Sequence, residues 1–300
     1  MARASVGWGL ICIAITGVVL QNHCAPVEDL GLAVLGAILV AGGLALHGMA
    51  LNDLLDMRRD ETLSPSRVRS WRGGPAHGAL LATSALVLAM LGAGLLGGQA
   101  VLVVVALAAG LLFYNAVARF IPAIGVLVLG LLVAGVAVLP GWPPPAPWLP
   151  WSLFTIAVAI GLMVHLLAGK RPQPSSRALV GLAVEWIVVS ALLLTVPVTA
   201  SLADAGDVQS WGLLWPGAAA VLLVLMLCGR LWKVRSGPRA ADSMLRMTGL
   251  WSGVFAASWC QSAGATGWAI GLLGATVLAA LSIIGLRELL SGDSDVVGWR

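Results

Sequence analysis

Ten long apolar runs follow one another along almost the whole chain. A transmembrane helix needs about 17–25 consecutive apolar residues, and candidate runs lie near 4–20, 29–51, 77–96, 99–118, 120–140, 151–168, 179–200, 211–229, 247–263 and 267–287. Only 10% of the 300 residues are charged, which is too few to cover the surface of a soluble domain. The sequence therefore predicts an all-α, polytopic membrane helix bundle of nine to ten transmembrane helices, forming a single domain over residues 1–300.

The two ends of the chain need separate arguments. The first run follows Arg3 and is similar to a signal peptide, but no small-residue cleavage site follows it, so we expect a retained first helix. The last two runs form one apolar stretch of about 40 residues, which as a single helix would be about 60 Å long, twice the hydrocarbon thickness. The sequence SAGATG at 262–267 is a natural place for this stretch to fold back.

The basic residues alternate with the predicted spans. If the N-terminus faces the cytoplasm, all 17 Lys and Arg residues fall in cytoplasmic segments, and the connections on the other side hold none. Such a bias is typical of cytoplasmic loops, so we predict a plasma membrane protein of the bacterial type with both termini in the cytoplasm. The same bias explains the pI of 9.2. We expect the basic segment 230–246 to contact anionic membrane lipids, and we expect no nucleic-acid partner.

The densest group of charges lies at the end of the second run, within ALNDLLDMRRDETLSPSRVRSWRGG at 50–74. If the helix continues through this segment, four side chains fall within about 100° of one another around its axis: Asn52, Asp53, Asp56 and Asp60. Neighbouring carboxylates repel one another and need a positive partner. Arg58 lies on the far side of the same helix and Arg59 borders only one edge of the group, so neither neutralises it well.

A divalent cation would neutralise these acids. Mg²⁺ prefers hard oxygen ligands and typically takes one or two carboxylates together with substrate phosphates. A phosphorylated lipid suits this place, because its tail would lie in the bilayer while its head group reached the metal and the arginines of the next loop. The spacing leaves one alternative open, which is a solvated acidic helix end that holds no ligand.

Other residue types give weaker signals. The cysteines show no metal spacing and are interpreted as small packed residues: Cys12, Cys24, Cys228 and Cys260. We expect His47 to be packed or hydrogen-bonded, whereas His165 has an equal case for facing a cavity. The Pro- and Trp-rich segment 140–151 predicts an ordinary external connection, with its tryptophans at the membrane interface.

The acidic segment carries a resemblance to a known family. NDLLDMRRD fits N-D-x-x-D-x-x-x-D, the first aspartate-rich motif of the UbiA family of intramembrane prenyltransferases. SPSRVRS downstream is similar to the Arg-rich loop of the family. YNAVAR at 114–119 is similar to its Y-x-x-x-x-K/R motif, and the later IGVLVLGLLVAG is similar to its Gly-containing fifth helix. The likeness covers roughly residues 30–140, and beyond them only the topology is similar.

The resemblance implies an all-α bundle that joins an isoprenyl diphosphate to a lipophilic acceptor, often aromatic, in a central cavity. Carried over by position, the Mg²⁺ ligands would be Asn52, Asp53, Asp56 and Asp60. Arg67 and Arg119 would contact the diphosphate. Tyr114 and Asn115 would line a cytoplasm-facing cavity among the second, fourth, fifth, sixth and seventh helices.

The chain departs from the family pattern after its sixth helix. The family has a second aspartate motif there, but HLLAGKRPQPSSRALVG at 165–181 contains no acid. Lys170 and Arg171 could hold diphosphate in place of a second metal. Glu185 could supply a replacement acid, or it could simply pair with Arg177 or Arg171. Alternatively, catalysis is lost, as in UbiA-like members with a degenerate second motif such as the EboC-type proteins.

These observations favour one function and leave two others open. The leading hypothesis is Mg²⁺-dependent transfer of a prenyl group from an isoprenyl diphosphate to a small acceptor of an aromatic, quinone or tetrapyrrole type. The main alternative is a non-catalytic protein that binds or helps transport a prenyl lipid or secondary metabolite. A sugar-phosphate transferase is the third, because such enzymes also place acids in cytoplasmic loops.

Overall fold

The computed structural model describes residues 2–63, 74–141, 144, 146–169, 172–201, 212–233 and 237–291, without the side chains of residues 2, 58–63, 196–201, 231–233 and 287–291. Over these residues the chain is helical and contains no strand. The helices are α1 (Ala2–Cys24), α2 (Leu30–Leu63), α4 (Gly74–Leu96), α5 (Gly98–Ala116), the short 3₁₀ turn η1 (Ala118–Phe120), α6 (Pro122–Ala137), α7 (Trp148–Leu167), α8 (Ser176–Ser201), α9 (Leu214–Lys233), α10 (Gly237–Ser262) and α11 (Thr266–Ser291).

Each of the ten predicted apolar runs corresponds to one α-helix, so the predicted all-α bundle is confirmed. Seven of these helices are long and apolar enough to cross a membrane, and α6 and α9 are apolar but shorter. Two boundaries differ from the prediction by ten residues or more. Helix α2 runs to Leu63, well past residue 51, and α10 begins ten residues before the expected start at 247. Both extensions are polar, so hydropathy alone makes these two helices too short.

The predicted fold-back near the C-terminal end is also confirmed. Helix α10 ends at Ser262 and α11 begins at Thr266. Gly264 between them has a φ of +75°, a left-handed conformation that glycine adopts without the steric cost of a side chain. The long apolar stretch therefore becomes an antiparallel helix pair, and α10 packs on α11.

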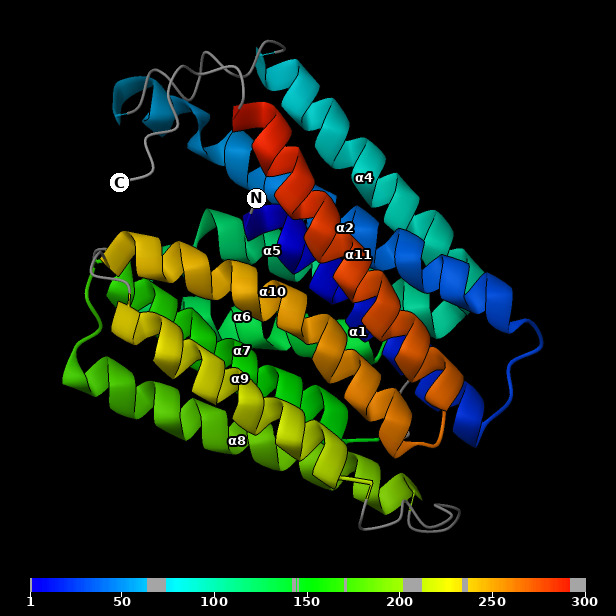
Figure 1. Cartoon of the computed structure of the whole chain (residues 1–300). Coiled ribbons are helices and arrows are strands. Elements are labelled where there is room, and N and C mark those ends of the chain that lie inside the picture. Colours follow the sequence, from blue (N-terminus) through cyan, green and yellow to red (C-terminus); the bar gives the residue numbers. More distant parts are fainter. Residues whose placement is uncertain are drawn as a thin grey trace.

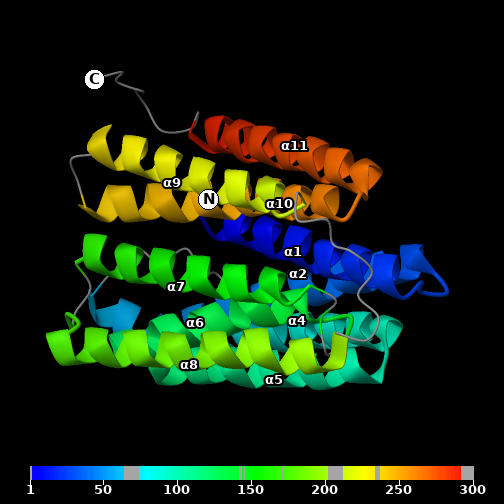
Figure 2. The ribbon, with the colours of Figure 1, turned by 90° about the horizontal axis from the view of Figure 1, so that it is seen from below.

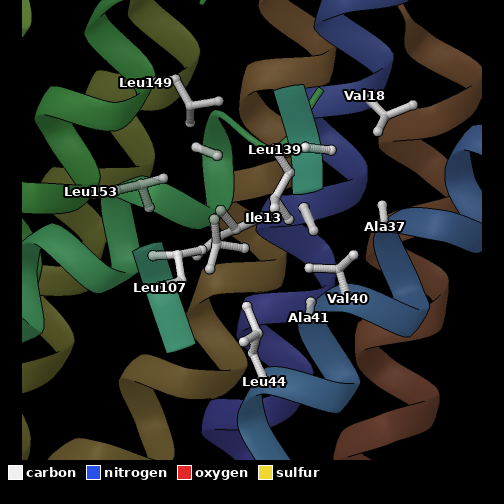
Figure 3. Close-up of a cluster of buried hydrophobic side chains, with 14 of the residues drawn as sticks. Ile13, Val18, Ala37, Val40, Ala41, Leu44, Leu107, Leu139, Leu149 and Leu153 are labelled. Carbon is white, nitrogen blue, oxygen red and sulfur yellow. The ribbon is translucent and has the colours of Figure 1, made fainter. Parts of the chain in front are cut away.

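The helices form one bundle in which α1 lies between two groups (Figures 1 and 2). Helix α1 packs on α2 on one side and on α10 on the other, while α2 packs on α4 and α6 packs on α7. The shared core contains apolar side chains from α1, α2, α5 and α7, including Ile13, Val40, Leu107 and Leu153 (Figure 3). This core packs α1, α2, α5 and α7 against one another.

Small residues let the central helices approach closely. A Cβ atom built on Gly9 of α1 would lie 2.6 Å from the carbonyl oxygen of Gly249 on α10, and one on Gly249 would lie 2.5 Å from the carbonyl carbon of Ser5. Gly43 on α2 faces Ala89 on α4 just as tightly. Backbones this close are typical of helix packing in membranes, where small residues maximise van der Waals contact.

Candidate functional site

Helix α2 carries the acidic motif on its continuous C-terminal part, as the sequence predicts. Asn52, Asp53 and Asp56 are all partly buried. The Asn52 side-chain amide donates to Asp53 Oδ1 at 3.4 Å, which links the first two residues of the motif directly. These three side chains therefore form one group, and the fourth predicted member, Asp60, has a side chain outside the described residues.

Arg119 joins this group from another part of the chain. Its guanidinium donates to both carboxylate oxygens of Asp56, over 2.9 Å and 2.5 Å, and also to Asn52 Oδ1 at 2.9 Å. A two-point Arg–carboxylate pair fixes both partners and is stronger than a bond between neutral groups. Both side chains are well covered, with 16% of Arg119 and 22% of Asp56 exposed, so water screens this pair less than a surface pair.

The local fold explains why Arg119 reaches α2. Helix α5 ends at Ala116, and the tight turn η1 places Arg119 before α6 begins at Pro122. Gly125 permits this turn, because a Cβ atom there would lie 2.7 Å from the carbonyl oxygen of Ala118. The Arg119 guanidinium also lies over the ring of Phe120, 4.7 Å from its centroid. Its Nε atom is buried and has no hydrogen-bond partner.

A second arginine reaches the motif from the start of the chain. Arg3 Nη1 lies 2.6 Å from Asp53 Oδ2. This pair is more open to water, with 53% of the Arg3 side chain and 25% of the Asp53 side chain exposed. Arg3, Asp53, Asn52, Arg119 and Asp56 thus form a continuous chain of polar contacts, which we call the charged network.

The charged network shows which cations neutralise the acids of the motif, and they differ from those that the sequence suggested. The sequence analysis considered only cations on the same helix, Arg58 and Arg59, and concluded that an arginine would not balance the acids. In the structure, Arg3 and Arg119 balance Asp53 and Asp56, from 50 and 63 residues away along the chain. Arg119 was predicted at the site, as a diphosphate contact. Arg3 was missed, although it is the only Lys or Arg before Arg58.

The two cavity residues predicted on α5 lie beside this network. Asn115 is almost fully buried, and its amide lies 3.0 Å from the carbonyl oxygen of Leu111 and 3.5 Å from that of Gly48. It therefore ties α5 to α2. Tyr114 is half-buried and within electrostatic range of Arg119. The resemblance implies that both residues lie near the bond that breaks when diphosphate leaves the prenyl group, and this role stays a prediction.

The remaining candidates lie on α7, α8 and the segment between them. His165 is buried at the end of α7 with Nε2 3.0 Å from the carbonyl oxygen of Pro172, which fixes it against the α7–α8 connection. Glu185 on α8 is half-buried and its Oε2 atom has no hydrogen-bond partner. Among the described side chains, no ion pair joins Glu185 to Arg177, so that predicted pairing is not formed. Three predicted diphosphate contacts lie outside the described residues: Arg67, Lys170 and Arg171.

The donor atoms of the charged network fit Mg²⁺ by their chemistry. Asn52, Asp53 and Asp56 supply one amide and two carboxylates, all hard oxygen donors, and Mg²⁺ commonly uses one or two carboxylates with waters and phosphate. In the part of the chain that the structure describes, no three His, Cys, Asp or Glu side chains gather as a ready-made site. A metal ion bound here would therefore need the Asn52 amide, water molecules and a substrate phosphate as further ligands.

A cavity lies elsewhere, between the beginnings of α7 and α9 and the end of α10. Its volume is about 310 Å³, and none of the predicted site residues lines it. Trp148, Trp151, Phe255 and Trp259 supply most of its aromatic wall. The sequence analysis missed it, because the tryptophans of α7 were attributed only to the membrane interface. The cytoplasm-facing cavity that the resemblance implies stays a prediction.

His47 behaves as expected from the sequence. It is buried, and its Nδ1 atom lies 2.8 Å from the carbonyl oxygen of Ala82 on α4. This contact joins α2 to α4 one turn before the acidic motif. His47 is therefore a packed, hydrogen-bonded residue that helps to position the helix carrying the motif.

Comparison with known proteins gives a likeness in structure. No protein-family model and no curated protein sequence matches the chain. A digeranylgeranylglyceryl phosphate synthase of membranes has a similar structure, with a TM-score of 0.56 and 17% identity over 88% of this chain and 99% of that one. The apo structure of a UbiA homologue from Aeropyrum pernix K1 is also similar, with a TM-score of 0.52 and 15% identity over 82% and 96%. The two likenesses cover 88% and 82% of this chain, so the chain has the UbiA-like fold, and its seven helices that are long and apolar enough to cross a membrane support an integral membrane protein.

Proposed function

We propose that this protein transfers a prenyl group from an isoprenyl diphosphate to a lipophilic acceptor within the membrane, with Mg²⁺ as cofactor. The observation that carries the proposal is the charged network at the end of α2, where Asn52, Asp53 and Asp56 meet Arg119. A UbiA-like fold supports it, because a structural neighbour is a synthase of prenylated glyceryl phosphate. The acceptor would be a small molecule of aromatic, quinone or tetrapyrrole type.

Each member of the network has a distinct role in this proposal. Asn52, Asp53 and Asp56, with Asp60 on the same helix, would hold Mg²⁺, which would supply positive charge to the departing diphosphate. Arg119 would donate to the diphosphate oxygens as negative charge develops on them. Its five N–H groups are arranged to bind two oxygens at once, which suits phosphate as well as carboxylate. Arg67, Lys170 and Arg171 would add charge around the same group.

The pairing of Arg119 with Asp56 gives the network a means of responding to substrate. The guanidinium is shared between a carboxylate and an amide, and its buried Nε atom has no partner. A bound diphosphate would offer Arg119 further acceptors, and Asp56 oxygens released from the arginine would then be available to hold the cation. We therefore expect binding of the substrate and binding of the cation to favour each other.

The test uses the purified full-length chain in lipid nanodiscs with labelled isoprenyl diphosphates, Mg²⁺ and a panel of acceptors. We expect release of diphosphate together with a prenylated product. Asp53→Asn and Asp56→Asn should each lower the rate by roughly 100-fold or more, because each removes a carboxylate that would hold the cation stabilising the departing diphosphate. Asp242→Asn is the matched control, because the Asp242 side chain is 55% exposed and pairs with Arg246 on α10. A double Asp53→Asn, Asp56→Asn variant that keeps the parental rate would exclude the proposal.

One observation favours the non-catalytic alternative. Asp53 and Asp56 are each already neutralised by an arginine, and the segment 165–181 contains no acid. A protein of this kind would bind an isoprenyl diphosphate and leave it intact. The same assay separates the two functions, since saturable binding without release of diphosphate, under every acceptor tested, supports a lipid-binding protein and contradicts transfer.

A further inference from the structure

Both described acids of the charged network are occupied by cations of the chain itself. Asp53 Oδ2 lies 2.6 Å from Arg3 Nη1, and Asp53 Oδ1 accepts from the Asn52 amide at 3.4 Å. Both carboxylate oxygens of Asp56 accept from Arg119. A divalent ion that binds to this motif must therefore share an oxygen with an arginine or take the place of that arginine.

The two arginines are held with different strength. Arg119 contacts both oxygens of Asp56 as well as Asn52 Oδ1, and only 16% of its side chain is exposed. The Arg3 side chain is 53% exposed. Exposed ion pairs are weak, because water reduces the attraction between the partners. Arg3 is therefore the arginine that can leave its acid at the lower cost.

The backbone that carries Arg3 is anchored, whereas its long side chain is half exposed. Ser5, two residues later, is fully buried, and a Cβ atom on Gly249 of α10 would lie 2.5 Å from the Ser5 carbonyl carbon. Two residues correspond to about 200° around a helix, so Arg3 projects from the other side of α1, where α2 packs. Withdrawal of Arg3 from Asp53 therefore needs rotation about side-chain bonds and no movement of α1.

A divalent ion could reach Asp53, and it would repel Arg3. The Asp53 side chain is 25% exposed, so part of it is open to a hydrated ion. A divalent ion about 5 Å from a guanidinium in water is repelled strongly enough to change its affinity roughly ten-fold, and salt lowers this figure. Binding of the ion and contact between Arg3 and Asp53 therefore oppose each other.

We propose that Arg3 is an internal competitor for the cation at Asp53, which occupies the carboxylate when no divalent ion is bound and withdraws when one binds. Arg3 thereby sets the cation concentration at which the acidic motif is filled. In this role Arg3 acts through Asp53 and not on the substrate. The inference rests on the proposed function, because that function places a cation at Asp53.

The test measures binding of Mn²⁺ alone to the full-length protein by electron paramagnetic resonance, in nanodiscs of zwitterionic phosphatidylcholine. Mn²⁺ takes the same carboxylate, carbonyl and water ligands as Mg²⁺. Arg3→Gln keeps a long polar side chain and removes the charge, so it should bind Mn²⁺ about 3–10-fold more tightly than the parent. Arg3→Lys keeps the charge and should bind Mn²⁺ as the parent does. Arg230→Gln, which removes an exposed arginine near the end of α9, is the matched control and should also bind as the parent does.

A second background tests whether Arg3 acts through Asp53. Asp53→Asn should weaken Mn²⁺ binding, which locates the ion at the acidic motif. Adding Arg3→Gln to this variant should then change the affinity by less than about two-fold, because the carboxylate for which Arg3 competes is gone. A general effect of Arg3 on surface charge or on stability would instead act equally in both backgrounds.

The transfer assay separates this inference from the proposed function. During turnover, Arg3→Gln should reach half of its maximal rate at about 3–10-fold lower Mg²⁺ than the parent. Tighter Mn²⁺ binding by Arg3→Gln without any release of diphosphate would support the competition and contradict prenyl transfer. Equal or weaker Mn²⁺ binding by Arg3→Gln overturns the competition, whether or not transfer occurs. Absence of Mn²⁺ binding by parent and variant alike also overturns it, because Arg3 then has no ion to exclude.

Discussion

The two ends of the bundle differ in how their buried polar atoms are paired. Each places polar atoms among apolar helices. At the charged network, Asp56 meets both nitrogens of Arg119, and Asp53 meets Arg3. At the aromatic cavity, the N–H groups of Trp151 and Trp259 meet nothing. The comparison shows that the charged side chains are paired between helices, whereas two buried indole N–H groups beside an apolar cavity have no partner.

The largest expected effect comes from removing one arginine of the charged network. Arg119→Ala should lower prenyl transfer by roughly 10²–10³-fold, because it removes a preorganised donor to the departing group. The measurement is kcat/KM for diphosphate release. Arg246→Ala, which removes a partly buried arginine that pairs with Asp242 on α10, serves as the control and should retain transfer.

An intermediate effect is expected at the close contact between α1 and α10. Gly249→Val places side-chain carbons against the backbone of Ser5 and Val6, so α1 must move away from α10. Overpacking of this kind costs about 1–3 kcal/mol, or roughly 2–10 °C in melting temperature for a chain of this size. Gly271→Val, where a Cβ meets nothing within 4 Å, should melt near the parent temperature. Equal melting of both variants would contradict the tight packing of α1 on α10.

The smallest effect concerns the two ion pairs of the charged network. Double-mutant cycles to alanine should give the exposed Arg3–Asp53 pair a coupling energy of about 0.2–1 kcal/mol. The Arg119–Asp56 pair should couple more strongly, because it is more covered and bonded at two points. Melting temperatures at low and high salt provide the measurement, and salt should weaken the Arg3 pair more. A larger coupling for Arg3–Asp53 would reverse the order that burial predicts.

The features predicted correctly from the sequence are those that one helix determines by itself. Apolar length placed the ten α-helices, and helical periodicity placed Asn52, Asp53 and Asp56 on one face. The likeness to UbiA proteins, based on the acidic motif and on YNAVAR, is confirmed at the level of the fold. Apolar length did not include the polar end of α2 or the polar start of α10, because these segments are helical without being apolar.

Features that depend on several helices could not be predicted. The residues around Arg3 do not indicate that the beginning of α1 lies beside Asp53. That position depends on how α1 packs between α2 and α10. The aromatic cavity combines residues from α7, α9 and α10, separated by up to about 110 positions in the sequence. Only the unusual number of tryptophans, 13 against a single tyrosine, could have drawn attention to indole chemistry.

The close glycine contact between α1 and α10 also constrains how the protein is made. Ser5 and Gly249 approach closely, yet they lie far apart along the chain, so the ribosome makes Ser5 well before Gly249. At about 5–20 residues per second, roughly 10–50 s separate their synthesis. During that interval α1 can already pack on α2 and α6, but the surface of α10 that it contacts has not yet been made. The close contact between α1 and α10 therefore forms only after most of the chain has been synthesised.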